Sequence, residues 1–117
     1  MGVGREEFLA RLADRFPDVI AQIRPDERGL LHLEVSAFGS ATVAAIDSGR
    51  LWAAEQHFRF VAELLPVAGP ELLNALEVSY LEELALRECT PARHRAVKER
   101  MPKGLRKILI GYHEQWQ

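Results

Sequence analysis

The histidines and the lone cysteine are the residues best suited to chemistry in this sequence, and their spacing fits none of the familiar metal sites. His32, His57, His94 and His113 are far apart, and no two of them stand four residues apart as in helical zinc sites. Cys89 has no second cysteine for a disulfide and no base close to it in the sequence. We therefore expect no metal and no cofactor, and we expect each histidine to be an ordinary surface or boundary residue.

Motifs for nucleophilic or phosphate chemistry are also missing from the sequence. It contains no Gly-x-Ser-x-Gly elbow, no Walker loop and no dinucleotide-binding glycine fingerprint. The glycines at positions 2 and 4 come too early to form a phosphate loop. We therefore expect a protein that is not an enzyme.

Among the carboxylates, Glu77 has the most unusual predicted surroundings. Helical geometry places it between Leu81 and Leu84, where a charge needs a partner such as Arg59 or Arg87, or its pKa rises. The structural interpretation is an ion pair or a boundary glutamate that reaches solvent. Four further glutamates either form an acidic patch or make up a solvated helix face: Glu55, Glu63, Glu82 and Glu83.

Trp52 lies in the middle of the narrow polar strip of an otherwise apolar helix. Tryptophan is unusual in such a strip and is enriched at the energetic centres of protein interfaces. The alternative is that a loop or the C-terminal helix covers the ring.

The pattern of apolar residues predicts helices throughout the chain. Residues 30–36 alternate as a strand would, but the longer window over 30–47 has helical periodicity, so we expect a helix there. Prolines at positions 17, 66, 70, 91 and 102 mark helix ends or starts. The expected helices are 5–16, 30–47, 50–65, 70–88, 91–101 and a last one from Pro102 to the C-terminus. Five large apolar residues of the last helix share one face, and we expect them in the core: Leu105, Ile108, Leu109, Tyr112 and Trp116.

These elements predict an all-α fold, a compact single domain over residues 1–117 with five to six helices. Stacked helical hairpins, as in a bundle or a short solenoid-like stack, would satisfy the short connections. The length of 117 residues and the apolar content of 48% are ordinary for one globular domain. No apolar run reaches membrane-spanning length and no signal peptide is evident, so we expect a cytoplasmic protein.

The charge is distributed unevenly along the chain. Residues 1–90 carry 8 basic and 15 acidic side chains, a net charge of -7, whereas residues 91–117 carry 7 basic and 2 acidic ones, a net charge of +5. We expect the basic segment 91–117 to pack on the acidic body. An alternative is that basic residues 93–107 bind nucleic acid, although no stacking aromatic residues interrupt them.

Two stretches of the sequence resemble a known family. They are HFRFVAELLPVAGPELLNALEVSYLEELAL in the centre and MPKGLRKILIGYHEQW at the end. Together they resemble a family of small all-helical bacterial domains of unassigned biochemistry. Members of that family occur near polymorphic toxin genes, including Rhs-type ones, and are regarded as immunity proteins.

The resemblance implies a non-enzymatic protein-binding module whose partner is a cognate protein toxin domain. An immunity protein of this kind would occlude the toxin in the cytoplasm of the producing cell, and an acidic body suits a basic toxin. The expected contact residues are Trp52, Glu55, Arg59, Glu77, Glu82 and Glu83. The nucleic-acid-binding or regulatory domain using residues 93–107 is the alternative.

Overall fold

The chain folds into an all-α domain, as its periodicity predicts. The computed structural model describes residues 2–85 and 91–112, and the side chains of these residues except those at 85, 91, 93, 94 and 110–112. The predictions made for Arg87, Cys89, His94, Tyr112 and the residues after it concern side chains outside the described ones. Within the described part the only β-type pairing is an isolated bridge between Val3 and Ala68.

The helices follow the predicted order, with one addition near the N-terminus. They are α1 Arg5–Arg15, α2 Pro17–Gln22, α3 Leu31–Asp47, α4 Leu51–Leu64, α5 Pro70–Ala75, the π-helix η1 Leu76–Tyr80, α6 Leu81–Ala85, α7 Pro91–Arg100 and α8 Lys103–Tyr112. The stretch that also resembled a strand is therefore the start of α3, the longest helix. The prediction of six helices missed α2, because Pro17 ends α1 and at the same time occupies the first turn of the next helix.

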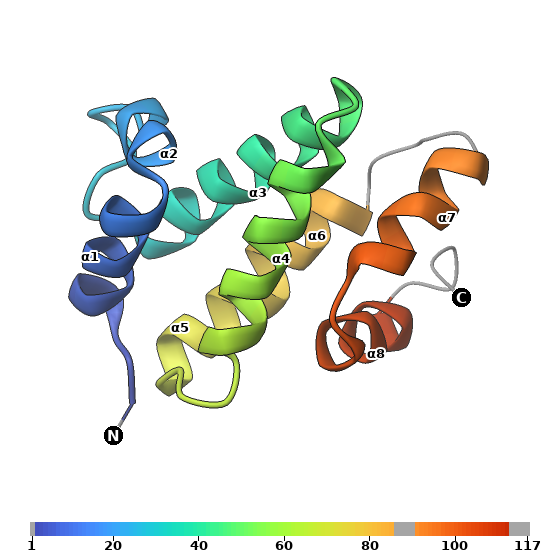
Figure 1. Ribbon diagram of the computed structural model, residues 1–117. Helices are drawn as coiled ribbons and strands as arrows, with labels where there is room; N and C mark the ends of the chain where they lie inside the picture. Colours follow the sequence, from blue (N-terminus) through green and yellow to red (C-terminus); the bar gives the residue numbers. More distant parts are fainter. Residues whose placement is uncertain (1, 86–90, 113–117) are drawn as a thin grey trace.

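Helix α3 is the central element of the arrangement (Figure 1). It packs against α2, α4 and the run from α5 through α6, and α4 in turn packs against α7 and α8. Its residue Gly39 allows the close approach of α6, because a Cβ added there would lie 3.0 Å from the Cβ of Glu83. A glycine inside a helix costs about 1 kcal/mol relative to alanine. Here the missing side chain allows α3 and α6 to pack closely.

The π-helical turn η1 explains how one long helix keeps a single buried face. Leu72, Leu76, Tyr80 and Leu84 are each four residues apart, and all are fully buried. In a regular α-helix such a spacing drifts by about 40° per step. A π-turn holds more residues per turn, so it offsets this drift and keeps Tyr80 directed toward α3.

Aromatic rings fill the centre of the core. Phe38 lies at the middle of the cluster, with ring centroids 5.9 Å from Phe16, 5.7 Å from Phe60 and 5.0 Å from Tyr80. Phe8 joins it through Phe60. Four of these rings come from different helices and the fifth, Phe16, lies at the α1–α2 corner, so the cluster ties α1, α3, α4 and η1 together.

Helices α7 and α8, the described part of the basic segment, pack on the body through apolar contacts. Val97 and Met101 are buried, and so are Leu105 and Leu109 of α8, while Ile108 is partly buried against the same core. The predicted core role of the last helix thus holds for its three described apolar residues.

Removal of a buried leucine from α8 tests this role. Leu109→Ala should lower the free energy of unfolding by about 2–5 kcal/mol, because it leaves a cavity among packed side chains. The matched control is Lys107→Ala, an exposed position on the same helix, which should change it by less than about 0.5 kcal/mol. Urea denaturation measures both, and equal small effects would mean that α8 is not part of the cooperative core.

A partly buried ion pair attaches the N-terminal helix to α3. Glu34 is 1% exposed, and its Oε1 and Oε2 accept hydrogen bonds from Arg5 Nε at 2.7 Å and Arg5 Nη2 at 2.8 Å. The backbone N–H of Gly29 donates a third bond to Oε2. The hydrogen-bonded guanidinium of Arg5 holds the pKa of Glu34 below its ordinary value despite the burial.

The lowered pKa of Glu34 gives a stability prediction with a defined sign. The folded state favours the carboxylate, so its contribution is present above the ordinary pKa of 4.5 and is lost as the pH falls below it. Glu34→Gln should lower the free energy of unfolding by about 1.5–3 kcal/mol at pH 7, and by less as the pH drops below 4.5. Glu7→Gln, which removes the exposed ion pair with Arg11, is the control and should cost about 0.5 kcal/mol or less. A penalty for Glu34→Gln that is constant from pH 7 to pH 3 would contradict this account.

Candidate functional site

A cleft lies where the corner between α1 and α2 meets α3 and α4. Its volume is about 490 Å³, within the range typical of ligand sites. Small residues of α3 and α4 line it, among them Ala41, Ala45 and Ala53. Larger and polar side chains surround these alanines: Arg15, Phe16, Asp18, Gln22, Arg50, Trp52, Gln56 and His57.

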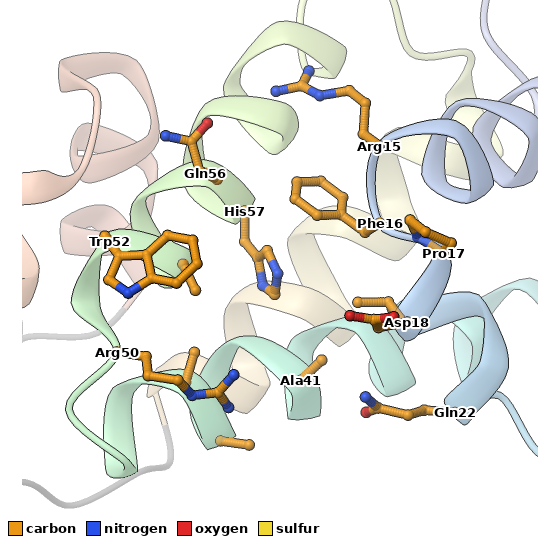
Figure 2. A pocket seen from close by; sticks show the side chains of 14 residues that line it. Arg15, Phe16, Pro17, Asp18, Gln22, Ala41, Arg50, Trp52, Gln56 and His57 are labelled. Carbon is orange, nitrogen blue, oxygen red and sulfur yellow. The ribbon is translucent and has the colours of Figure 1, made fainter.

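His57 is the buried polar residue of this cleft. In Figure 2 its ring lies between Trp52 and Phe16. The side chain is 7% exposed, and its ring centroid lies 4.7 Å from that of Phe16 in an edge-on arrangement. Sequence spacing alone gave no reason to separate this histidine from the other three, and the prediction of a surface or boundary position was wrong for it.

A network of hydrogen bonds fixes His57 from inside the core. Its Nδ1 lies 2.8 Å from Thr42 Oγ1, which also lies 2.9 Å from the hydroxyl of Tyr80 and 3.2 Å from the carbonyl oxygen of Phe38. Burial raises the pKa of Tyr80, so its hydroxyl keeps its proton and is able to donate a hydrogen bond. Thr42 has one proton and two lone pairs, so all three contacts are satisfied when it donates to Phe38 and accepts from Tyr80 and His57.

The arrangement that satisfies all three contacts of Thr42 is the one in which neutral His57 carries its proton on Nδ1. In that tautomer the second ring nitrogen, Nε2, is a hydrogen-bond acceptor, and the structure shows no protein partner for it among the described residues. Burial, together with the positive charge of Arg50, lowers the pKa of His57 to about 4. The imidazole is therefore neutral at pH 7 and presents a lone pair.

Thr42 and His57 also resemble a nucleophile and its base, since a hydroxyl and an imidazole lie within hydrogen-bonding distance. The hydroxyl of Thr42 is fully buried and occupied by three contacts. A substrate carbonyl has no access to it, so the pair acts as a structural anchor.

The exposed surface beside the cleft belongs to the outer face of α4. Trp52 is 69% exposed, which is the largest exposure among the big apolar side chains that the structure describes. Arg59 and Glu55 form an ion pair at 3.3 Å one turn further along the helix. Glu63 then pairs with Arg15 of α1 at 2.5 Å, and the Arg15 guanidinium lies over the ring of Phe60.

The predicted contact residues divide into two groups in space. Trp52, Glu55 and Arg59 share the outer face of α4, whereas Glu82 and Glu83 lie on α6 and Glu77 lies on η1. Glu83 accepts a hydrogen bond from Ser36 Oγ at 2.8 Å and lies against Gly39 of α3.

The predicted glutamates differ in exposure and in the partners that they contact. Glu77 is half-buried and is not without a partner, and Glu82 is exposed. The four glutamates therefore do not form one acidic patch. Glu55 and Glu63, both on α4, pair with arginines, whereas Glu83 on α6 contacts α3.

Two arginines of the basic segment donate hydrogen bonds to nearby backbone carbonyl groups. Arg100 Nη1 donates to the carbonyl oxygen of Ala96, and Arg106 Nη2 donates to that of Met101. Among the described residues, no three His, Cys, Asp or Glu side chains cluster as a metal site would require. None of the described helices is both long and apolar enough to cross a membrane.

The chain belongs to the family described as a domain of unknown function (DUF7674), whose model matches residues 9–117. Neither a curated protein nor a solved structure matches the chain. The family description names no activity and no partner.

The pKa of His57 gives a prediction for this site. Because the fold favours the neutral ring, its contribution to stability is complete above the ordinary pKa of 6.5 and declines as the pH falls toward about 4. We expect an NMR titration of the His57 ring to show a midpoint of about 4, with the signal assigned by comparison with His57→Gln. Between pH 6.5 and about 4 the parent should lose stability because His57 becomes protonated in the unfolded state. This contribution to the loss should be absent from His57→Gln. A midpoint near 6.5 would mean that the ring is open to solvent in the folded state.

Proposed function

We propose that this domain is a non-enzymatic protein-binding module that presents the outer face of α4 to a partner protein. The observation that carries the proposal is the exposed indole of Trp52 beside a cleft. Burying a tryptophan is among the largest single contributions to a protein interface. The fold does not require this ring, since its large exposure leaves it little contact with the core.

The surroundings of Trp52 fit the anatomy of an interface. Polar and charged groups flank the ring along α4, among them Gln56 and the Glu55–Arg59 pair. A partner that covers the indole would leave these groups at the rim, where they fix orientation and remain in contact with water. The cleft next to the ring offers a hollow for a side chain of the partner.

In its specific form the proposal is an immunity protein that acts in the cytoplasm by covering a cognate toxin domain. The sequence resemblance to domains found beside toxin genes supports this form. The net charge of -7 over residues 1–90 supports a partner with a basic surface, because opposite charge speeds encounter.

The test begins with the gene next to this one: if that gene encodes a toxin domain, the domain is co-expressed with this protein. The parent protein should protect the cells, and the purified pair should bind in calorimetry. Trp52→Ala should weaken binding by roughly 30-fold or more, the effect of losing about 2 kcal/mol at an interface anchor. Its melting temperature should stay close to that of the parent, because an exposed ring contributes little to the fold.

Val67→Ala is the matched control for this experiment. Val67 is also an exposed apolar side chain, 46% accessible, but it lies in the loop between α4 and α5. Its removal should leave protection and affinity unchanged. Full protection by Trp52→Ala with unchanged affinity would exclude this face as the interface. Tight binding of duplex DNA that weakens steeply with salt would favour the nucleic-acid alternative instead.

A further inference from the structure

The cleft contains two opposite charges that the fold leaves available. Arg50 donates only its Nε, to Ser48 Oγ at 2.9 Å, and its terminal amino groups have no hydrogen-bond partner among the described residues. Asp18 likewise has no ion-pair or hydrogen-bond partner in the described part of the chain. In Figure 2 the guanidinium and the carboxylate lie on opposite sides of Ala41. They line one cleft without pairing with each other, since no N···O distance between them is within 4.0 Å.

His57 adds a neutral hydrogen-bond acceptor to the same cleft. Thr42 holds its Nδ1, so Nε2 is the nitrogen that the ring offers to the cleft. A histidine that is more than nine-tenths buried and lines a cleft with one ring nitrogen uncommitted is suited to accept a hydrogen bond from a ligand.

The rest of the cleft combines small and aromatic side chains with three polar residues, Gln22, Gln56 and Arg15, of which Arg15 pairs with Glu63. The alanines of α3 and α4 leave room inside the cleft, and the rings of Trp52 and Phe16 line two of its sides. An apolar group of a ligand would gain contact area against these rings.

We infer that this cleft binds a free α-amino acid with an apolar side chain. Its carboxylate pairs with the guanidinium of Arg50, and its ammonium group donates hydrogen bonds to Asp18 and to His57 Nε2. Its side chain packs against Trp52 or Phe16. The site requires both charges of the ligand, because a simple anion would meet the carboxylate of Asp18 and a simple cation the guanidinium of Arg50.

A free amino acid fits this arrangement better than an internal peptide segment. In a peptide bond the amino and carboxyl groups lose their charges, so neither Arg50 nor Asp18 would find its counterpart. This inference does not depend on the proposed protein-binding role, although the two share Trp52, and it is tested with the purified protein alone.

Calorimetry with matched ligands tests the inference. The probes are L-phenylalanine and L-leucine, together with 3-phenylpropionate, which lacks the amino group, and phenethylamine, which lacks the carboxylate. The parent protein should bind both amino acids, and should bind L-phenylalanine at least tenfold more tightly than either of its analogues.

Two charge-removing variants should give a crossed pattern. Asp18→Asn should lose at least tenfold in affinity for L-phenylalanine but keep its affinity for 3-phenylpropionate or improve it. Arg50→Gln should lose at least tenfold for L-phenylalanine but keep or improve its affinity for phenethylamine, and Arg50→Lys should recover part of the loss. The controls Asp14→Asn and Arg11→Gln remove exposed charges of α1 that do not line the cleft, and should bind as the parent does.

The outcomes separate this inference from its alternatives. The crossed pattern, with melting temperatures close to the parent, supports a zwitterion site. Absence of binding by all four probes at millimolar concentration overturns it. Equal affinity for L-phenylalanine and one of its analogues also overturns it, since only one charge would then be recognised. Binding of a toxin domain by a protein that fails this test would leave the cleft as part of a protein interface.

Discussion

The side-chain oxygen of Thr42 is the point on which the rest of the structure depends. It lies on α3 and joins Tyr80 of η1 and His57 of α4 at distances of 2.8–2.9 Å. A hydroxyl in a dry core is favourable only when its proton and its lone pairs are used, and here each of them has a partner. Any shift of α4 or η1 along α3 would leave at least one buried polar group without its bond, at a cost of about 1–3 kcal/mol. The network therefore fixes the register of three helices that apolar packing alone would allow to slide.

The π-turn and the aromatic cluster follow from the same requirement. The wider turn at Leu76–Tyr80 places the hydroxyl of Tyr80 toward α3 while the leucines on either side stay in the core. Phe38, one turn before Thr42, then stacks against both Tyr80 and His57 with ring centroids 5.0 Å apart in each case. Polar contacts and ring packing thus specify one arrangement, which is the consistency expected of a uniquely folded core.

Most of the fold could be predicted from the sequence because its signals are local. Apolar periodicity with prolines at the boundaries identified the helices, including α3, where a short alternating run gave the opposite indication. Helix α2 was missed because a proline was interpreted only as a stop. The π-turn was missed because its cause, the need to keep Tyr80 and Leu84 on one face, is visible only against a packed neighbour.

The site was far less predictable, since its contacts join residues remote in sequence. Trp52 could be singled out because a large ring in a polar strip is anomalous within its own helix. The burial of His57 and of Glu34 could not, since their partners Thr42 and Arg5 stand 15 and 29 positions away. The cleft depends on small residues such as Ala41, and an alanine carries no sequence signal for the space that it leaves.

The two faces of α4 explain how one short domain can combine a rigid core with an adaptable surface. The inner face carries the buried side chains, among them Phe58 and Phe60, and joins the network through His57. The outer face carries Trp52, Gln56 and Arg59, which are all exposed, and Arg59 forms its ion pair within α4 itself. Side chains on the outer face can therefore change without disturbing the register that Thr42 sets. His57 is the exception, because its ring belongs to the core network through one nitrogen and to the cleft through the other. A ligand that engages Nε2 is thereby coupled to the position of α3 and η1, whereas a partner that contacts only Trp52 is not.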